Sequence, residues 1–195
     1  MVFVDRPPAF LDADTVVVDN EVGTRRGIAH LIAHGHRRIA YLGALHTIVT
    51  AEQRVAGYRA ALAAARIEPD ESLVRLDIQN SEHAHAVARE LLQTGDPPTA
   101  FFAAQNMITI GVVHALRELD LHRRIAVVGF DDVPLFDLLE PAVTVLAQDA
   151  WAIGRQAATA LFDRLDGSTA PTRTHVIPVS LIERGSGEIR GPHSA

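Results

Sequence analysis

The stretch TAFFAAQNMITIGVVHALRELDLHRRIAVVGFDD, residues 99–132, decides the fold class. It begins with an apolar run at 99–104, continues with a helical pattern that starts at Asn106, and ends in a second apolar run at 125–130. Short apolar runs that alternate with helical segments are typical of parallel strands buried on both faces. The stretch therefore predicts one βαβ unit of a doubly wound α/β sheet.

The same alternation extends to both sides of this unit. Further strands are predicted at residues 2–4, 15–18, 39–42, 73–76, 143–146 and 175–184. Helical patterns begin after Asp19 or Asn20, at Thr50, at Ser81 and after Asp149. Strand and helix thus alternate through most of the chain, as a parallel α/β sheet requires.

Composition excludes several classes of protein. The 195 residues are 48% hydrophobic and 22% charged, which suits one domain or two small lobes. With a net charge of −6, the chain lacks the excess of basic residues that a nucleic-acid-binding surface requires. The absence of Cys excludes disulfides, thiolate metal sites and cysteine nucleophiles. Because no run approaches the roughly 20 apolar residues of a membrane span and no signal-peptide pattern follows Met1, we expect a cytoplasmic chain without a membrane partner.

Polar side chains follow the predicted strands, at the edge where ligands bind in open parallel sheets. These positions are Asp19, Asn20, Thr50, Arg54, Gln105, Asn106, Asp131 and Gln148. Arg54 offers a fork of donors and Asp131 a pair of acceptors, which together can clamp the vicinal hydroxyls of a sugar. The alternative is structural: the Asn and Asp residues cap helices, and Arg54 forms an ion pair with Glu52 or Asp19.

Signals of catalysis and of metal binding are weak. The chain has no G-x-S-x-G elbow, no phosphate loop and no G-x-G-x-x-G that opens a helix, so we expect neither an enzyme nor a cofactor. His30, His34 and His36 lie close together near a predicted helix end, but a metal site needs further ligands. A solvated helix flank is the favoured interpretation, and no metal site is expected.

Three motifs occur in a characteristic order. They are VVVDNEVGTRRGIAHLIAHGHRRIAYLG at 16–43, RVAGYRAALAAARI at 54–67 and VVGFDDVPLFDLLEPAVTVLAQD at 127–149. From residue 2 to about 184, the chain closely resembles the effector-binding core of LacI/GalR-type transcription regulators. The resemblance implies a type I periplasmic-binding-protein fold, in which two α/β lobes joined by crossover strands close on a small ligand.

The resemblance also implies a ligand site. Its expected ligand-binding residues are Arg54, Asp131, Thr50, Gln105, Gln148, Asp19 and Asp5. Arg54 stands where the family's arginine grips the effector, and Asp131 is the first acid of GFDD, which contacts sugars in sugar-responsive members. Gln105-Asn106 replaces the Asn-Asp of many members, so the usual acid is absent and the identity of the effector is left open; Asn106 is still expected to cap the following helix.

The start of the chain departs from the family pattern, in which a helix-turn-helix domain and most of the N-terminal lobe come first. The resemblance implies that 1–18 and 148–170 are a remnant of that lobe, that 19–147 and 171–185 form a nearly complete C-terminal lobe, and that 186–195 is a disordered tail. DNA would be contacted only through the missing N-terminal domain.

One loop is too apolar to lie in water without a reason. Its apolar residues are Leu135, Phe136, Leu138 and Leu139, and the corresponding family segment packs against a second subunit. The chain is therefore expected to form a homodimer, with a loop that folds back as core as the alternative.

The expected function is the sensing of a small-molecule effector, a carbohydrate or related polar compound, by a LacI-type regulator. Ligand-dependent lobe closure would then control transcription. A solute-binding protein of a sugar transport system is the alternative, but it should carry a signal peptide.

Overall fold

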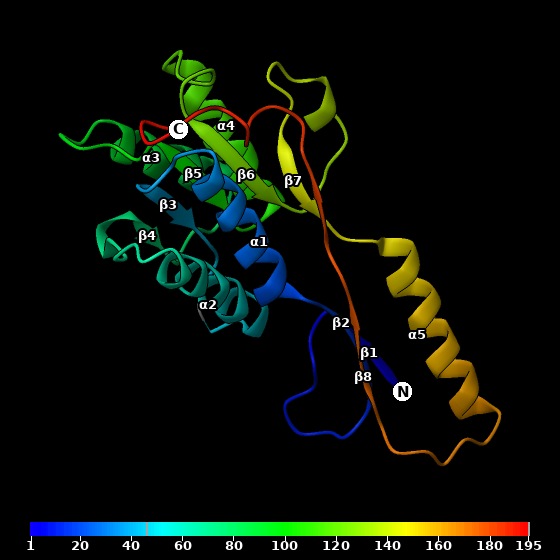
Figure 1. Ribbon diagram of the computed structural model, residues 1–195. Coiled ribbons are helices and arrows are strands. Elements are labelled where there is room, and N and C mark those ends of the chain that lie inside the picture. The colour runs from blue at the N-terminus through cyan, green and yellow to red at the C-terminus, as the bar shows by residue number, and fades with distance from the viewer. Residues whose placement is uncertain (46, 195) are drawn as a thin grey trace.

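Two sheets of different size organise the chain in the computed structural model, which describes residues 1–45 and 47–194 (Figure 1). The larger sheet has six strands in the order β4-β3-β5-β6-β7-β9, and the smaller has three in the order β1-β2-β8. All neighbouring strands run parallel except β7 and β9. The strands are β1 (Val2–Val4), β2 (Asp14–Val18), β3 (Ile39–Leu42), β4 (Val74–Arg75), β5 (Ala100–Ala103), β6 (Ala126–Phe130), β7 (Thr144–Ala147), β8 (Thr174–Ile177) and β9 (Ser180–Ile182).

Helices cover both faces of the larger sheet. They are α1 (Asn20–Ala33), α2 (Val49–Ala64), α3 (Ser81–Leu92) and α4 (Asn106–Glu118), with α5 (Ala150–Leu165) beside the smaller sheet and 3-10 turns η1 (Glu71–Leu73) and η2 (Phe136–Leu138). Helices α1 and α2 pack together, and so do α3 and α4. The doubly wound α/β class is therefore confirmed.

Successive side chains of β5 point to opposite faces of the sheet, and both faces are buried. Phe102 packs with the α1 and α2 side, whereas Phe101 packs with the α3 and α4 side, and both rings are 0% exposed. Burying one such side chain contributes about 1.5–3 kcal/mol. The apolar run that predicted this strand is apolar because both of its faces are core.

The last predicted strand, 175–184, is two strands in the structure. β8 joins the smaller sheet and β9 the larger, with Pro178 and Val179 between them. Proline has no backbone N–H to donate to a ladder, so pairing stops there and the chain changes sheets. We call the larger sheet with α1–α4 the larger lobe, which is the expected C-terminal lobe, and the smaller sheet with α5 the smaller lobe. The assignment of 171–185 to the C-terminal lobe is corrected, because β8 pairs with β2 of the smaller lobe.

The C-terminal segment 186–194 is packed against the lobe, which corrects the expectation of a disordered tail. Ser186 is buried; its Oγ donates to the carbonyl of Val127 (2.7 Å) and accepts from the N–H of Thr144 (2.9 Å). Further along, the carbonyl of Ile189 lies 2.8 Å from Nε2 of the buried His36. These tertiary hydrogen bonds fix a segment whose composition alone is typical of a loop.

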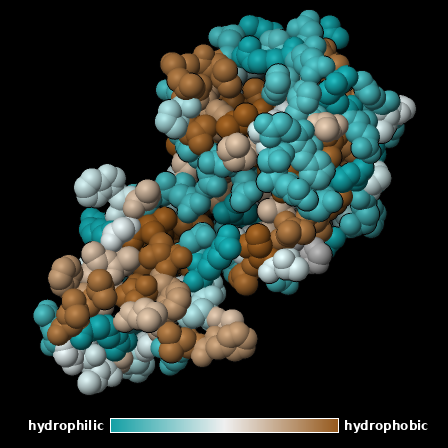
Figure 2. Space-filling model, turned by 180° about the vertical axis from the view of Figure 1, so that it is seen from behind, coloured by the Kyte–Doolittle hydropathy of each residue, from teal (hydrophilic) through white to brown (hydrophobic). Residues whose placement is uncertain are grey.

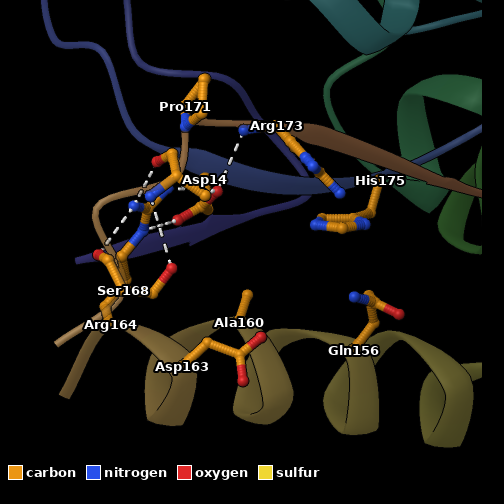
Figure 3. Close-up of a pocket in the computed structure, with 10 residues that line it drawn as sticks. Asp14, Gln156, Ala160, Asp163, Arg164, Ser168, Pro171, Arg173 and His175 are labelled. Atoms are coloured by element: carbon orange, nitrogen blue, oxygen red, sulfur yellow. Dashed lines mark hydrogen bonds and ion pairs between the residues drawn. The ribbon is translucent and has the colours of Figure 1, made fainter. Parts of the chain in front are cut away.

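A paired charge holds α5 to the smaller sheet (Figure 3). Arg164 contacts both carboxylate oxygens of Asp14, at 2.6 and 3.2 Å, and the N–H of Arg173 donates to the same carboxylate. The hydrogen bond from Arg164, opposed by desolvation, lowers the pKa of Asp14 to about 2. A groove of about 140 Å³ lies beside this pair.

The smaller lobe carries much exposed apolar surface (Figure 2). Trp151 of α5 is 88% exposed, and Phe162, Leu165 and Val176 are also largely exposed. Surface of this kind usually faces another part of a protein or a partner. None of the described helices is both long enough and apolar enough to cross a membrane.

Candidate functional site

The sheet reverses its strand order between β3 and β5, because the chain adds β4 on one side and β5 on the other. Ligands of open α/β sheets bind at the carboxyl ends of the strands beside such a switch point. A small cavity of about 10 Å³ lies there, lined by Ala44, Ile48, Thr50, Ala51, Arg54, Ala104 and Gln105. Three predicted site residues, Thr50, Arg54 and Gln105, therefore share one wall.

Arg54 of α2 is the centre of this wall, and it is only 6% exposed. Its Nε donates to Asn20 Oδ1 at 2.8 Å and its Nη1 to the carbonyl of Ala104 at 2.6 Å. The guanidinium carbon lies 3.6 Å from the ring centre of Phe130. Neither Glu52 nor Asp19 forms an ion pair with Arg54, so the ion-pair part of the structural alternative is wrong.

Arg54 is a buried cation with acidic residues near it. Burial lowers the pKa of its guanidinium, while the charges of Asp131 and Asp5 and the nearby Tyr41 act in the opposite direction. A guanidinium stays protonated in proteins. The site therefore combines a fixed positive charge with carboxylates near enough to affect it.

Asp131 and Asp5 share an unusual backbone conformation. Their φ angles are 72° and 71°, in the left-handed region that costs an ordinary residue about 1–2 kcal/mol. The N–H of Asp131 donates to the carbonyl of Leu146, and its carboxylate accepts from Gln148 Nε2. Gln148 directly follows β7, the neighbour of β6, so two adjacent strand ends hold this acid–amide pair. Such strained conformations cluster at binding sites.

Asp19 has a different role from the one expected. Its Oδ1 accepts from the N–H of Val179 at 2.7 Å, and Arg26 donates to the carbonyl of the same residue. Asp19 makes no capping hydrogen bond with its side chain. It thus braces the crossover between β8 and β9, with only part of its carboxylate left for other contacts.

Two further residues shape the site, and neither is among the expected ligand-binding residues. Asn20 is 1% exposed and orients Arg54, while Phe130 provides the ring beneath the guanidinium. The strand-end rule includes Asn20, directly after Asp19, and could have been extended to Phe130, directly before Asp131. Asn106 is not the helix cap: that position is Gln105, and Asn106 Oδ1 accepts from the N–H of Met107.

The apolar loop splits into an inward and an outward half. Phe136 is 4% exposed and packs with Val143 and Val145, with Leu139 against the same cluster. Leu135 and Leu138 are 65% and 74% exposed. The alternative of a core role thus holds for Phe136, which is unavailable at a surface, and only the outward pair is free to meet a second subunit.

Comparison with known proteins assigns the fold to a family. A family model described as a periplasmic binding protein-like domain matches residues 28–187, which is more than half of the chain. The chain belongs to this family. Within it, the chain is an effector-binding domain of the LacI type, as the resemblance in its motifs implied, and the curated relatives are transcriptional regulators rather than enzymes.

Three relatives of this LacI-type domain show its extent. The HTH-type transcriptional regulator CelR of Thermobifida fusca is 35% identical over 88% of this chain and 51% of its own length. The structure of a transcriptional regulator CelR–cellobiose complex superimposes with a TM-score of 0.86 at 33% identity, covering 95% of this chain and 58% of that one. The structure of a LacI-family regulatory protein from Chloroflexus aggregans superimposes with a TM-score of 0.88 at 28% identity, covering 97% of this chain and 68% of that one. The chain spans about half the length of CelR and of the transcriptional repressor CytR of Escherichia coli.

Proposed function

We propose that this LacI-type domain senses a carbohydrate effector, with Arg54 and Asp131 as the main ligand-binding pair. The observation that carries the proposal is that a buried donor fork and an acid–amide pair lie at the carboxyl ends of strands in one sheet, with Asp131 near enough for its charge to act on Arg54. Sugar hydroxyls both donate and accept, so they can satisfy all three groups. The similarity to a regulator solved with cellobiose makes a β-linked glucose disaccharide the first compound to test.

The geometry supports binding between lobes rather than in a closed pocket. The cavity beside Arg54 holds about one water molecule, so a sugar must rest on this edge and be covered from the other side. Asp5, on the smaller lobe, is close enough to influence Arg54. A ligand held by both lobes favours one lobe arrangement, and this difference in affinity is what can shift an attached DNA-binding domain.

Nuclear magnetic resonance titration tests the site even at millimolar affinity. We expect cellobiose to shift the backbone amide signals of Gln105, Asp131 and Gln148 in the 195-residue chain. Arg54→Ala and Asp131→Asn should each weaken binding at least 10-fold, the loss of about 1.4 kcal/mol. Asp120→Asn, which removes a distant acid, serves as the charge control. Equal affinity in all variants would show that the ligand binds elsewhere.

The smaller lobe is proposed to be completed by additional chain in the full regulator. Its support is the exposed apolar surface of α5 and the fact that this chain covers 58% and 68% of the two solved relatives. The DNA contact would lie in the same additional part, since this chain carries a net charge of −6. A regulator of this type acts in the cytoplasm. No observation favours a transport protein instead, because the relatives named above are regulators.

A homodimer is proposed through the outward half of the apolar loop and the neighbouring face of α4. Leu135, Leu138, Met107 and Ile110 are all exposed in the single chain. In sedimentation equilibrium, Leu138→Asp should yield monomers, whereas Leu11→Asp, a matched change on the smaller lobe, should leave the dimer intact. A dimer that survives Leu138→Asp would remove the loop from the interface.

A further inference from the structure

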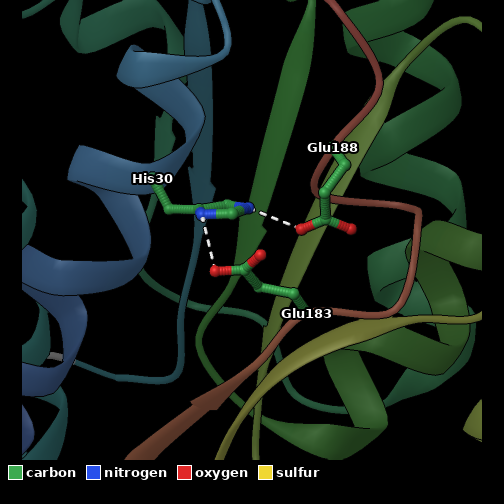
Figure 4. A group of neighbouring side chains, drawn as sticks. All are labelled: His30, Glu183 and Glu188. Atoms are coloured by element: carbon green, nitrogen blue, oxygen red, sulfur yellow. Dashed lines mark hydrogen bonds and ion pairs between the residues drawn. The ribbon is translucent and has the colours of Figure 1, made fainter.

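Two acidic side chains meet a histidine in the larger lobe (Figure 4), and none of the three lines the cavity beside Arg54. His30 lies on α1, Glu183 directly follows β9, and Glu188 lies in the C-terminal segment. His30 Nε2 is 2.5 Å from Glu188 Oε1, and His30 Nδ1 is 3.8 Å from Glu183 Oε1. Within the described residues, this is the group whose three ligand atoms all lie within 4.8 Å of one another.

This arrangement supplies what the histidine spacing lacked in the sequence. One imidazole and two carboxylates form a ligand set that suits Zn²⁺ and neighbouring transition metals better than Ca²⁺ or Mg²⁺, which prefer oxygen ligands alone. The side chain of Glu183 is 63% exposed and can rotate toward an ion, whereas that of His30 is 9% exposed and fixed. The group therefore has a rigid inner side and an open outer side.

The supporting contacts resemble those that orient metal ligands. Glu188 accepts from Thr144 Oγ1 at 2.8 Å and from the N–H of Gly185. Hydrogen bonds of this kind fix the direction of a ligand and typically contribute 10–100-fold to metal affinity.

We propose that His30, Glu183 and Glu188 bind a divalent transition-metal ion, best matched by Zn²⁺, which fastens the C-terminal segment to α1. On binding, the imidazole changes tautomer through solvent: the hydrogen between His30 Nε2 and Glu188 leaves, Nδ1 gains one, and the Nε2 lone pair is donated to the metal. Tetrahedral zinc separates two ligands by about 3.4 Å, so the pair now 2.5 Å apart opens by roughly 1 Å. The site is independent of the effector proposal, because it shares no residue with it.

Isothermal titration of the untagged 195-residue chain with ZnCl₂ at pH 7.5 tests the proposal. We expect one site, a higher melting temperature with Zn²⁺, and affinity at least 10-fold lower in Glu183→Gln and in His30→Gln. Glu183 is exposed, so its variant should fold as the wild type does, which circular dichroism checks.

Two control variants separate this site from general binding by surface histidines. Glu68→Gln removes an acid elsewhere, and His114→Gln breaks the other close pair, His85 and His114. Both should bind Zn²⁺ as the wild type does. Equal affinity in all variants, or a loss confined to His114→Gln, would overturn the proposal.

Discussion

The contact between Asn20 and Arg54 gives the sharpest prediction for the stability of the site. Asn20→Ala removes the acceptor of Arg54 Nε and the donor to Gln53 Oε1, at 2.8 and 3.0 Å, and also a longer bond of 3.3 Å to the carbonyl of Val18. Because both Asn20 and Arg54 are buried, water does not readily replace the lost partner. The guanidinium would keep its bond to Ala104 and its contact with Phe130, but not its orientation.

The magnitude follows from the two shorter bonds, to Arg54 and to Gln53. A buried hydrogen bond to a charged group is worth about 1.5–3 kcal/mol and a neutral one about 0.5–1.5 kcal/mol. Asn20→Ala should therefore lower the free energy of unfolding by about 2–4 kcal/mol. With a urea slope of about 2.5 kcal/mol/M, the unfolding midpoint should fall by about 1 M.

Urea unfolding followed by circular dichroism measures this shift. Gln53→Ala removes only the neutral bond and should lower the midpoint by less than half as much. Asn20→Asp keeps an acceptor for Arg54 and should recover part of the loss. If Asn20→Ala and Gln53→Ala shift the midpoint equally, the bond to Arg54 contributes nothing and the reasoning fails.

Three further predictions concern the frame around the site. Gly23→Ala places a Cβ 2.2 Å from a methyl of Val179 and should destabilise the chain by about 1–3 kcal/mol in thermal melts. An unchanged melting temperature would mean that the segment between β8 and β9 can shift at little cost in free energy. Asp14→Asn should cost about 1–2 kcal/mol at pH 7. Because folding lowers the pKa of Asp14 from 3.8 to about 2, its contribution is complete above pH 4 and is lost as the pH falls to 2, so variant and wild type should converge there in unfolding titrations. Phe136→Ala should cost about 3–5 kcal/mol in urea unfolding, and a loss below about 1 kcal/mol would contradict its core position.

The layered core could be predicted because its signal is local. Phe101 and Phe102 stand in one continuous apolar run, and only a strand covered on both faces requires adjacent residues of that kind. The break between β8 and β9 was missed because Pro178 sits inside a run that reads as one strand. Which sheet each half joins depends on β2 and β7, which lie far away in the sequence.

The site was predictable to the level of the strand ends but not of individual neighbours. Asp19 and Asn20 both follow β2, and no local rule says which of them contacts Arg54. Asp19 is not available to Arg54 in the same way, because its carboxylate accepts a hydrogen bond from the N–H of Val179, 160 positions away in the sequence. The C-terminal segment 186–194 is likewise fixed by residues distant in sequence, since Ser186 donates a hydrogen bond to Val127, 59 positions earlier.

The segment 174–194 bears on how the protein is synthesised. It supplies an edge strand to each sheet, and beyond β9 it hydrogen-bonds to the strands and helix of the larger lobe. A growing chain on the ribosome would therefore carry two unfinished sheets until this segment emerged. Their open edges would be exposed to other nascent chains throughout that interval. Neither sheet can therefore acquire its final edge strand before this segment has been synthesised.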